Sequence, residues 1–134
     1  MDVLRTETQP IRSTEDVVLV RQAVRTWAVE LGFSLVDQTK VVTATSELAR
    51  NTATYGGGGT LTLEVVSAGA RRGLRLTFLD DGPGIKDLDQ AMKDGFTTGT
   101  GLGLGLSGAK RLSSEFEIVS TVGHGTRVTI TRWK

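Results

Sequence analysis

The sequence predicts an α/β two-layer sandwich of the α+β kind, in which helices cover one face of a mixed, mostly antiparallel β-sheet. Two observations support this fold class. Segments with helical periodicity fill the first part of the chain, and segments that alternate like strands follow in closely spaced pairs. Strands joined by a few residues form hairpins, so we expect an antiparallel or mixed sheet with three helices on one face.

Length and composition limit the class of protein. The chain has 134 residues, which fits one domain over residues 1–134. Its hydrophobic content of 38% supports a core, but no apolar run approaches the ~20 residues that span a bilayer. The start of the chain has no secretory signal, and the absence of cysteine fits a reducing cytoplasm. The basic residues are scattered and the formal charge is +1, so we expect neither nucleic acid nor a membrane as a partner.

The first helix is expected over about residues 14 to 31. Ser13 and Thr14 precede two acidic residues, a pattern typical of a helix N-cap with a favourable first turn. Apolar residues then recur at helical spacing, and Gly32 follows the last of them. These apolar positions are Val17, Val20, Val24, Trp27, Ala28 and Leu31.

A second helix is expected over about 37 to 54. Asp37 is interpreted as its N-cap, and the four glycines at 56–59 end it as a loop. A short helix is expected near 87–93, and a third long one over about 103 to 113, after a glycine-rich stretch.

Four strands are expected from alternating apolar residues. Residues 60–67 and 74–80 flank the sequence AGARRG, which is interpreted as a hairpin turn. Residues 115–121 and 126–133 flank a second short turn. The expected order is therefore helix, helix, strand, strand, loop, helix, strand, strand.

Glu47 and Asn51 lie four residues apart in the second expected helix, so they share one face about one turn apart. A carboxylate can accept a proton from an attacking hydroxyl group, and an amide oxygen suits Mg²⁺. For an isolated pair of this kind, a solvated polar face is the commoner interpretation. Both residues lie beside the apolar stripe of the helix, which adds a little support for a site.

Residues 80–85 (DDGPGI) predict a sharp turn at a strand end. The carboxylate of Asp80 could accept the exocyclic amine of adenine, while the glycines let the ring approach the backbone. An ordinary hairpin loop explains the same residues, because Asp-Gly and Pro-Gly are common turn pairs.

Alternate glycines between residues 99 and 105 precede the third long helix. They free N–H groups to point at an anion, and a helix N-terminus adds its dipole, so a phosphate chain is the natural ligand. A flexible linker is the alternative, but leucine at every second position indicates a shaped loop. The strand of a Rossmann fingerprint is missing here, and so are the Walker A lysine and the signatures of eukaryotic-type protein kinases.

Residues 123–126 (GHGT) precede the last strand. Thr126 could add a hydroxyl near the adenine, although a tight hairpin with a strand-starting threonine is the simpler interpretation. His124 is the single histidine and has no partner pattern for a metal or a catalytic triad, so it is interpreted as an exposed loop residue.

Together these four elements follow the order E-x-x-x-N, D-x-G-x-G, G-x-G-x-G and G-x-G-T. They resemble the N, G1, G2 and G3 boxes of the GHKL ATPase superfamily, which includes gyrase, Hsp90, histidine kinases and MutL. The combination in this order is much more specific than any one motif. The resemblance implies the Bergerat ATP-binding fold, with ATP and Mg²⁺ as ligands and a lid over the nucleotide.

Within that superfamily, the chain is similar to the RsbT-type serine kinases of the bacterial stressosome over nearly its whole length. The matching segments are 32–40, 43–51, 80–85, 94–112 and Trp133. This resemblance implies phosphorylation of a serine on STAS-domain scaffold proteins. It also implies a second partner, a PP2C-type phosphatase that the released kinase binds and activates.

The resemblance also implies roles for individual residues. Glu47 would be the general base for the substrate serine, Asn51 would bind Mg²⁺, and Asp80 would hold the adenine amine. The other implied nucleotide-binding positions are Gly82, Gly84, Ile85, Thr97, Thr98, Gly101, Leu102, Gly103, Leu104, Gly105 and Thr126.

Two departures from the superfamily pattern matter. There is no dimerisation helix with a phosphoacceptor histidine, which argues against autophosphorylation on histidine. The basic residue that often follows the asparagine of the N box is also missing. A cation for the γ-phosphate must therefore come from elsewhere, with Arg50, Lys93 and Lys110 as candidates.

Two other functions stay open. Anti-sigma factors of the same superfamily resemble the chain in the boxes, and they sequester a sigma factor as well as phosphorylating. A nucleotide-dependent switch without catalysis is the second alternative. The segment 47–51 (ELARN) and the lid region favour the stressosome type.

Overall fold

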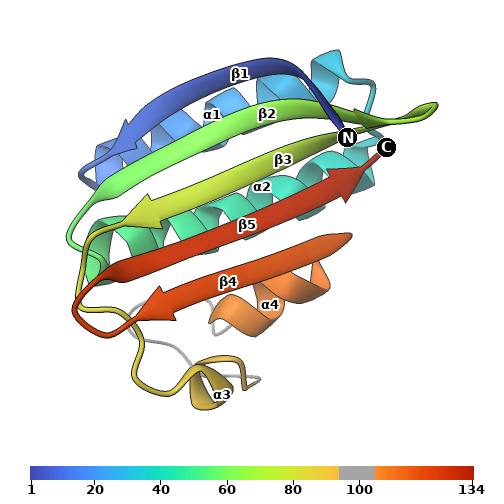
Figure 1. Ribbon diagram of the computed structural model, residues 1–134. Helices are drawn as coiled ribbons and strands as arrows, with labels where there is room; N and C mark the ends of the chain where they lie inside the picture. Colours follow the sequence, from blue (N-terminus) through green and yellow to red (C-terminus); the bar gives the residue numbers. More distant parts are fainter. Residues whose placement is uncertain (94–104) are drawn as a thin grey trace.

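The structure is a computed structural model that describes residues 1–93 and 105–134. Helices cover one face of a five-stranded sheet (Figure 1), which confirms the predicted α/β sandwich. The described elements are β1 (Asp2–Ile11), α1 (Thr14–Glu30), α2 (Leu35–Arg50), the π-helical turn η1 (Asn51–Tyr55), β2 (Gly59–Ala68), β3 (Arg71–Asp80), α3 (Leu88–Ala91), α4 (Gly105–Arg111), β4 (Glu115–Thr121) and β5 (Gly125–Trp133).

The strand order is β1-β2-β3-β5-β4, and every neighbouring pair is antiparallel. Both predicted hairpins are confirmed. The strands of the first hairpin are longer than expected, because β2 and β3 pair as far as Ala68 and Arg71 and leave a two-residue turn. The register places Asp80 beside Gly59 on one side and Thr126 on the other, so the end of β3 lies within the sheet rather than at its edge.

β1 is an edge strand that the sequence analysis did not predict. Its side chains are almost all exposed, and only Ile11 at its end is fully buried. An exposed strand lacks apolar alternation, so periodicity cannot detect it. The guanidinium of Arg5 lies 3.8 Å from the ring centroid of Trp27 and donates a hydrogen bond to Glu30 at 2.7 Å. These contacts join β1 to α1.

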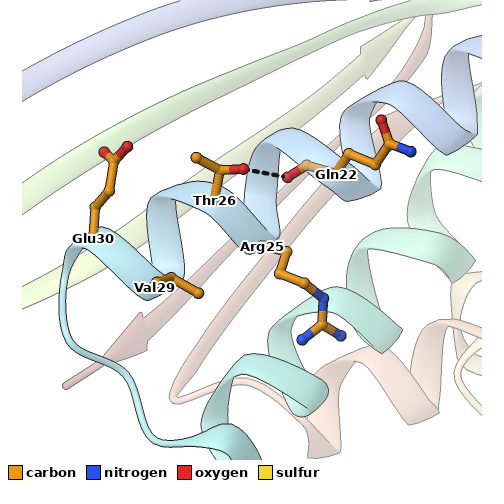
Figure 2. Close-up of a pocket in the computed structure, with 5 residues that line it drawn as sticks. All are labelled: Gln22, Arg25, Thr26, Val29 and Glu30. Atoms are coloured by element: carbon orange, nitrogen blue, oxygen red, sulfur yellow. Dashed lines mark hydrogen bonds between the residues drawn. The ribbon is translucent and has the colours of Figure 1, made fainter.

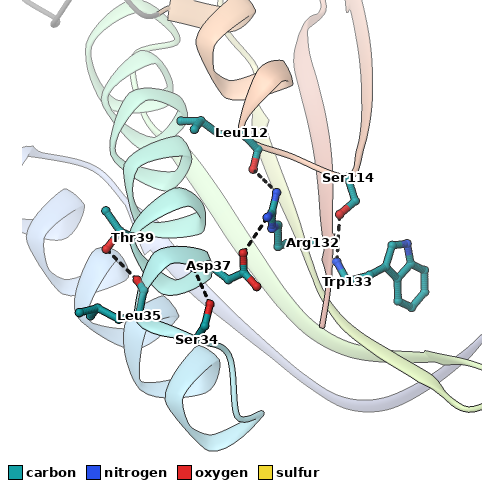
Figure 3. A network of polar contacts seen from close by, with 8 residues as sticks. All are labelled: Ser34, Leu35, Asp37, Thr39, Leu112, Ser114, Arg132 and Trp133. Atoms are coloured by element: carbon teal, nitrogen blue, oxygen red, sulfur yellow. Dashed lines mark hydrogen bonds and ion pairs between the residues drawn. The ribbon is translucent and has the colours of Figure 1, made fainter.

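α2 begins earlier than expected, because Ser34 rather than Asp37 is its N-cap. The Ser34 hydroxyl accepts the N–H of Asp37 at 3.1 Å. The Asp37 carboxylate instead accepts a hydrogen bond from Nη2 of Arg132 at 2.7 Å, and Nη1 donates to the carbonyl of Leu112 at 3.2 Å (Figure 3). Arg132 therefore ties the start of α2 and the chain after α4 to the end of β5.

The apolar core lies between the sheet and the helices. The predicted stripe of α1 is buried, apart from Leu31, which is partly buried at the helix end. This stripe packs with α2 against alternate residues of the central strands. Each fully buried apolar side chain contributes about 1.5–3 kcal/mol to the stability of the fold. Four of these strand residues are 0% exposed: Leu61, Leu63, Leu74 and Leu76. Within the described residues, no helix has the length and apolar character needed to cross a membrane.

Candidate functional site

Apart from Gly105 on α4, the predicted residues that the structure describes lie in or just after elements whose ends come together at one end of the sheet. The C-terminal ends of α2 and β3 and the start of β5 meet there (left in Figure 1). This arrangement follows from the antiparallel pairing of β3 with β5 and from the course of α2 over the sheet. Segments far apart in the sequence can therefore contribute to one site.

Glu47 lies on the buried side of α2, with only 4% of its surface exposed. Its Oε1 atom accepts a hydrogen bond from Nη1 of Arg50 at 3.3 Å, and the Arg50 side chain stays 38% exposed. A carboxylate this deeply buried requires a partner, because an unpaired buried charge is unfavourable. Of the three candidate cations, Arg50 therefore pairs with the predicted base, while Lys93 and Lys110 are exposed.

α2 does not continue as an α-helix to residue 54, as the sequence predicted, but widens into η1. The N–H of Gly56 closes this turn on the carbonyl of Asn51 at 2.9 Å, one residue beyond α-helical spacing. The hydroxyl of Thr52 donates to the carbonyl of Leu48 at 3.0 Å and is buried with it. Single π-helical turns are frequent at functional sites, and this one begins at the predicted magnesium ligand.

Asp80 ends β3, and its Oδ1 atom accepts the N–H of Gly82 at 2.9 Å. Burial raises the pKa of Asp80 above its ordinary value. Hydrogen bonds from the backbone N–H groups of Gly82 and Thr126 oppose this rise, and the charge of Asp81 adds a smaller increase. Carboxyl groups with perturbed pKa values cluster at functional sites, so Asp80 is a candidate functional residue.

The turn after Asp80 is held in place by the β4–β5 hairpin. The hydroxyl oxygen of Ser120 accepts the N–H of Ile85 at 2.8 Å and lies 2.8 Å from the hydroxyl of Thr126. The N–H of Gly123 donates to the carbonyl of Pro83 at 2.9 Å. Two segments about 40 residues apart in the sequence are thus joined into one hydrogen-bonded unit.

Ser120 is a residue of this site that the sequence analysis missed. It alternates with Phe116 and Ile118 on the less exposed face of β4. A single polar residue at the end of an apolar strand stripe is the signal that could have found it. Thr126, predicted to add a hydroxyl near the adenine, has that hydroxyl within hydrogen-bonding distance of Ser120.

Two glycines of this unit are required by their surroundings. Gly84 has a φ of +76°, and a Cβ atom there would overlap the carbonyl of Thr121. Gly125 has a φ of +93°, and its Cβ would overlap the carbonyl of Asp80. The sequence motif predicts a glycine at position 84 for close approach of a base, and the packing of the turn on β4 is a second reason for it.

The structure brings several predicted residues into one cluster and leaves others outside its description. Asp80, Gly82, Gly84, Ile85 and Thr126 form the cluster. Gly56, the C-cap residue of η1, packs against it, because a Cβ atom added there would lie 2.6 Å from Oδ2 of Asp80. Gly105 opens α4 with a φ of +54°. The positions outside the described residues are Thr97, Thr98, Gly101, Leu102, Gly103 and Leu104.

A surface hollow on α1 is separate from this cluster. Its lining residues are Gln22, Arg25, Thr26, Val29 and Glu30 (Figure 2). The hydroxyl of Thr26 donates to the carbonyl of Gln22 at 3.0 Å, a bond within the helix. None of the predicted site residues lines the hollow, so it is not part of the candidate site.

A family model described as histidine kinase-, DNA gyrase B- and HSP90-like ATPase matches residues 36–134. The matched region contains every predicted site residue and most of the helix that carries Glu47 and leads to Asn51. The chain belongs to this ATPase family.

Sequence relatives define the group within the family. The serine/threonine-protein kinase RsbT of Bacillus subtilis (strain 168) is 47% identical over 118 residues, 88% of this chain and 89% of RsbT. Anti-sigma F factors of Thermoanaerobacter sp. (strain X514) and Thermoanaerobacter pseudethanolicus (strain ATCC 33223 / 39E) are each 26% identical over 129 residues, 92% of this chain and 89% of theirs. The identity to RsbT over most of both chains makes this protein an ATP-dependent serine/threonine-protein kinase of the RsbT type.

Solved structures share the fold. The structure of the RsbU and RsbW domains of Rv1364c from Mycobacterium tuberculosis matches with a TM-score of 0.62 and 23% identity, covering 96% of this chain and 33% of that one. The mycobacterial sensor histidine kinase MprB matches with a TM-score of 0.55 and 17% identity, covering 96% of this chain and 97% of that one. At these identities the likeness establishes the fold alone.

Proposed function

We propose that this kinase transfers the γ-phosphate of ATP to a serine or threonine of a STAS-domain stressosome protein. Once released from that substrate, it activates a PP2C-type phosphatase in stress signalling. The similarity to RsbT supports the class of substrate. The observation that carries the catalytic part is the packing of Gly56, the C-cap residue of η1, against the Asp80 side chain. We place the reaction in the cytoplasm, where ATP is available. Residues 1–134 would act as one domain, with neither nucleic acid nor a membrane as a partner.

Asp80 is the proposed receptor for the adenine base. Its Oδ1 atom already accepts the N–H of Gly82, and the remaining lone pairs of the carboxylate can accept the exocyclic amine. An ionised carboxylate only accepts hydrogen bonds, so it favours the 6-amino group of adenine over the 6-oxo group of other purines. The hydroxyls of Ser120 and Thr126 support the neighbouring turn.

Asn51 is the proposed Mg²⁺ ligand. The described residues contain no group of three or more His, Cys, Asp or Glu placed to hold a metal ion. A single amide oxygen would therefore share the ion with phosphate oxygens, a division that fits Mg²⁺. When bound, Mg²⁺ neutralises negative charge on the phosphates. The positions proposed to hold the phosphates are Thr97, Thr98, Gly101, Leu102, Gly103, Leu104 and Gly105.

Glu47 is the proposed general base. The serine oxygen attacks the γ-phosphorus, the bond to the bridging oxygen of ADP breaks, and the hydroxyl proton passes to the Glu47 carboxylate. Arg50 donates to Oε1, so Oε2 is the better placed proton acceptor. The same hydrogen bond fixes the orientation of the carboxylate on α2.

Glu47→Gln tests the role of the base. We expect kcat to fall about 10²–10⁴-fold, because general-base catalysis is lost, while ADP affinity stays unchanged. Glu15→Gln is the matched control, since Glu15 is exposed in the first turn of α1. Phosphate incorporation into a purified STAS-domain partner is measured by mass spectrometry after incubation with Mg·ATP. A wild-type rate in Glu47→Gln would refute the assignment.

Asn51→Ala tests the metal ligand. Phosphotransfer should be lost, and ATP affinity should weaken in Mg²⁺ but change little in EDTA, because only the metal contact is removed. Isothermal titration under both conditions measures the difference. Full kinase activity in this variant would contradict the metal role. No uptake of adenine nucleotide by the wild-type protein, with Mg²⁺ present, would overturn the whole proposal.

Sequestration of a sigma factor is the second candidate function, favoured by the two anti-sigma F factors among the relatives. Pull-downs against a sigma factor and a STAS-domain protein, at equal concentrations and with ATP present, separate the two. Retention of the sigma factor alone would favour this candidate over the stressosome substrate.

A further inference from the structure

Gly56 joins the proposed metal side of the site to the proposed adenine side. Its N–H closes the π-helical turn on the carbonyl of Asn51 at 2.9 Å, so its position is tied to the proposed magnesium ligand. The residue itself is buried. Its φ of −79° is an ordinary helical value, so backbone conformation does not require glycine at this position.

Contact with Asp80 is what requires glycine. A Cβ atom at Gly56 would lie 2.6 Å from Oδ2 and 2.7 Å from Cβ of Asp80, closer than non-bonded atoms approach. Gly82 is packed in the same way, because its own Cβ would lie 2.7 Å from the carbonyl oxygen of Gly56. Gly56 thus lies against both the carboxylate and the backbone that binds it.

The Asp80 carboxylate is therefore confined from two directions. The N–H of Gly82 holds Oδ1 at 2.9 Å, and the backbone of Gly56 lies beside Oδ2. We propose that Gly56 is a specificity-determining residue: by having no side chain, it allows the one orientation of Asp80 that distinguishes a 6-aminopurine from a 6-oxopurine. This inference rests on the proposed function, in which Asp80 receives the amine of adenine.

Gly56→Ala is the test, read with two ligands. We expect ADP affinity to fall about 10–100-fold, because the carboxylate is displaced from its hydrogen bond. Affinity for inosine diphosphate, whose 6-oxo group cannot donate a hydrogen bond to the carboxylate as the 6-amino group does, should change less than about threefold. The ADP-to-IDP affinity ratio, measured by isothermal titration with Mg²⁺, should shrink about tenfold or more. A purely structural role would weaken both ligands alike and leave this ratio unchanged.

Gly57→Ala is the matched control. Gly57 is the next residue, has a φ of +74°, and has open space where a Cβ would be added. Alanine there strains the backbone without touching Asp80. The control should therefore unfold at a lower temperature than the wild type and keep the wild-type ADP-to-IDP ratio. A reduced ratio in Gly57→Ala would overturn the inference, because strain of the loop alone would then explain the effect.

A second variant keeps the test decisive if Gly56→Ala does not fold. Asp80→Gly removes every Asp80 side-chain atom that the added methyl would meet, so Gly56→Ala combined with Asp80→Gly should fold and melt close to Asp80→Gly alone. Failure of the double variant to fold would overturn the inference. If the wild type binds ADP and Gly56→Ala keeps the wild-type ratio, this inference fails while the proposed function stands.

Discussion

Ionisation of Asp80 has opposite effects on stability and on binding. Its folded-state pKa is raised, mainly by burial, so the group stabilises the fold below its unfolded pKa, and this contribution is lost as pH rises through the folded pKa. At neutral pH the ionised carboxylate therefore lowers the free energy of unfolding. Binding of adenine needs that same ionised form, since only it accepts hydrogen bonds with all its oxygens.

Asp80→Asn should therefore raise the melting temperature at pH 7 and weaken ADP binding. The gain in melting temperature should shrink as pH falls through the folded pKa of Asp80, because the wild-type carboxyl is then neutral as well. Thermal melts over a pH series and ADP titration at pH 7 measure the two effects. A lower melting temperature at pH 7 with unchanged ADP affinity would contradict both expectations.

Among the elements, α2 and the residue that follows α4 both accept hydrogen bonds from Arg132, at the end of the sheet opposite the candidate site. The Arg132 side chain is 19% exposed and Asp37 is 30% exposed, so their 2.7 Å ion pair is partly shielded from water. The hydrogen bond from Arg132 holds the pKa of Asp37 below its ordinary value, although burial opposes this. A depressed pKa means that the contribution is present above the unfolded pKa and lost as pH falls through the folded one.

Arg132→Leu should lower the free energy of unfolding at pH 7 by roughly 1–3 kcal/mol, because a charged hydrogen bond is lost and the carbonyl of Leu112 loses its donor. The deficit should narrow at an acidic pH below the folded pKa of Asp37, which itself lies below its ordinary value, because the carboxyl is then protonated in the wild type. Urea denaturation of the wild type and the variant, at pH 7 and at the acidic pH, measures the loss in free energy of unfolding. Asp37→Asn, which keeps an oxygen acceptor, should lose less than Arg132→Leu at pH 7. A deficit independent of pH would show that the ion pair is not its source.

For the whole molecule, stability lies in the layer between the sheet and the helices. Leu76 is 0% exposed in the middle of β3, which is paired on both sides. Val119 is 47% exposed on the edge strand β4. Apolar side chains at these two positions therefore differ in how much they stabilise the fold.

Leu76→Ala should reduce the free energy of unfolding by about 2–5 kcal/mol, because the cavity adds to the lost burial. Val119→Ala is the control and should change it by less than about 0.5 kcal/mol. Guanidinium denaturation of both variants at one temperature gives the comparison. Similar losses in the two would mean that the core is not where the sequence pattern and the structure place it.

Local patterns in the sequence determined most of the elements and the class of fold. Helical spacing from Val17 to Ala28 and strand alternation over residues 60–67, 74–80, 115–121 and 126–133 indicate which side of each element is buried, because the spacing of apolar residues is a local property of the segment. The sequence motifs likewise indicated Glu47, Asn51 and Asp80 as site residues, because the residue types and their short spacings are local features of the chain.

Only the tertiary structure decided which groups face one another. β1 was missed because its pairing with β2 joins segments more than 45 residues apart without an apolar pattern. The bonds of Ser120 to the Asp80 turn and the contact of Gly56 with Asp80 depend on packing between elements. Such contacts are set by how the whole chain closes around its core, and no local spacing encodes them.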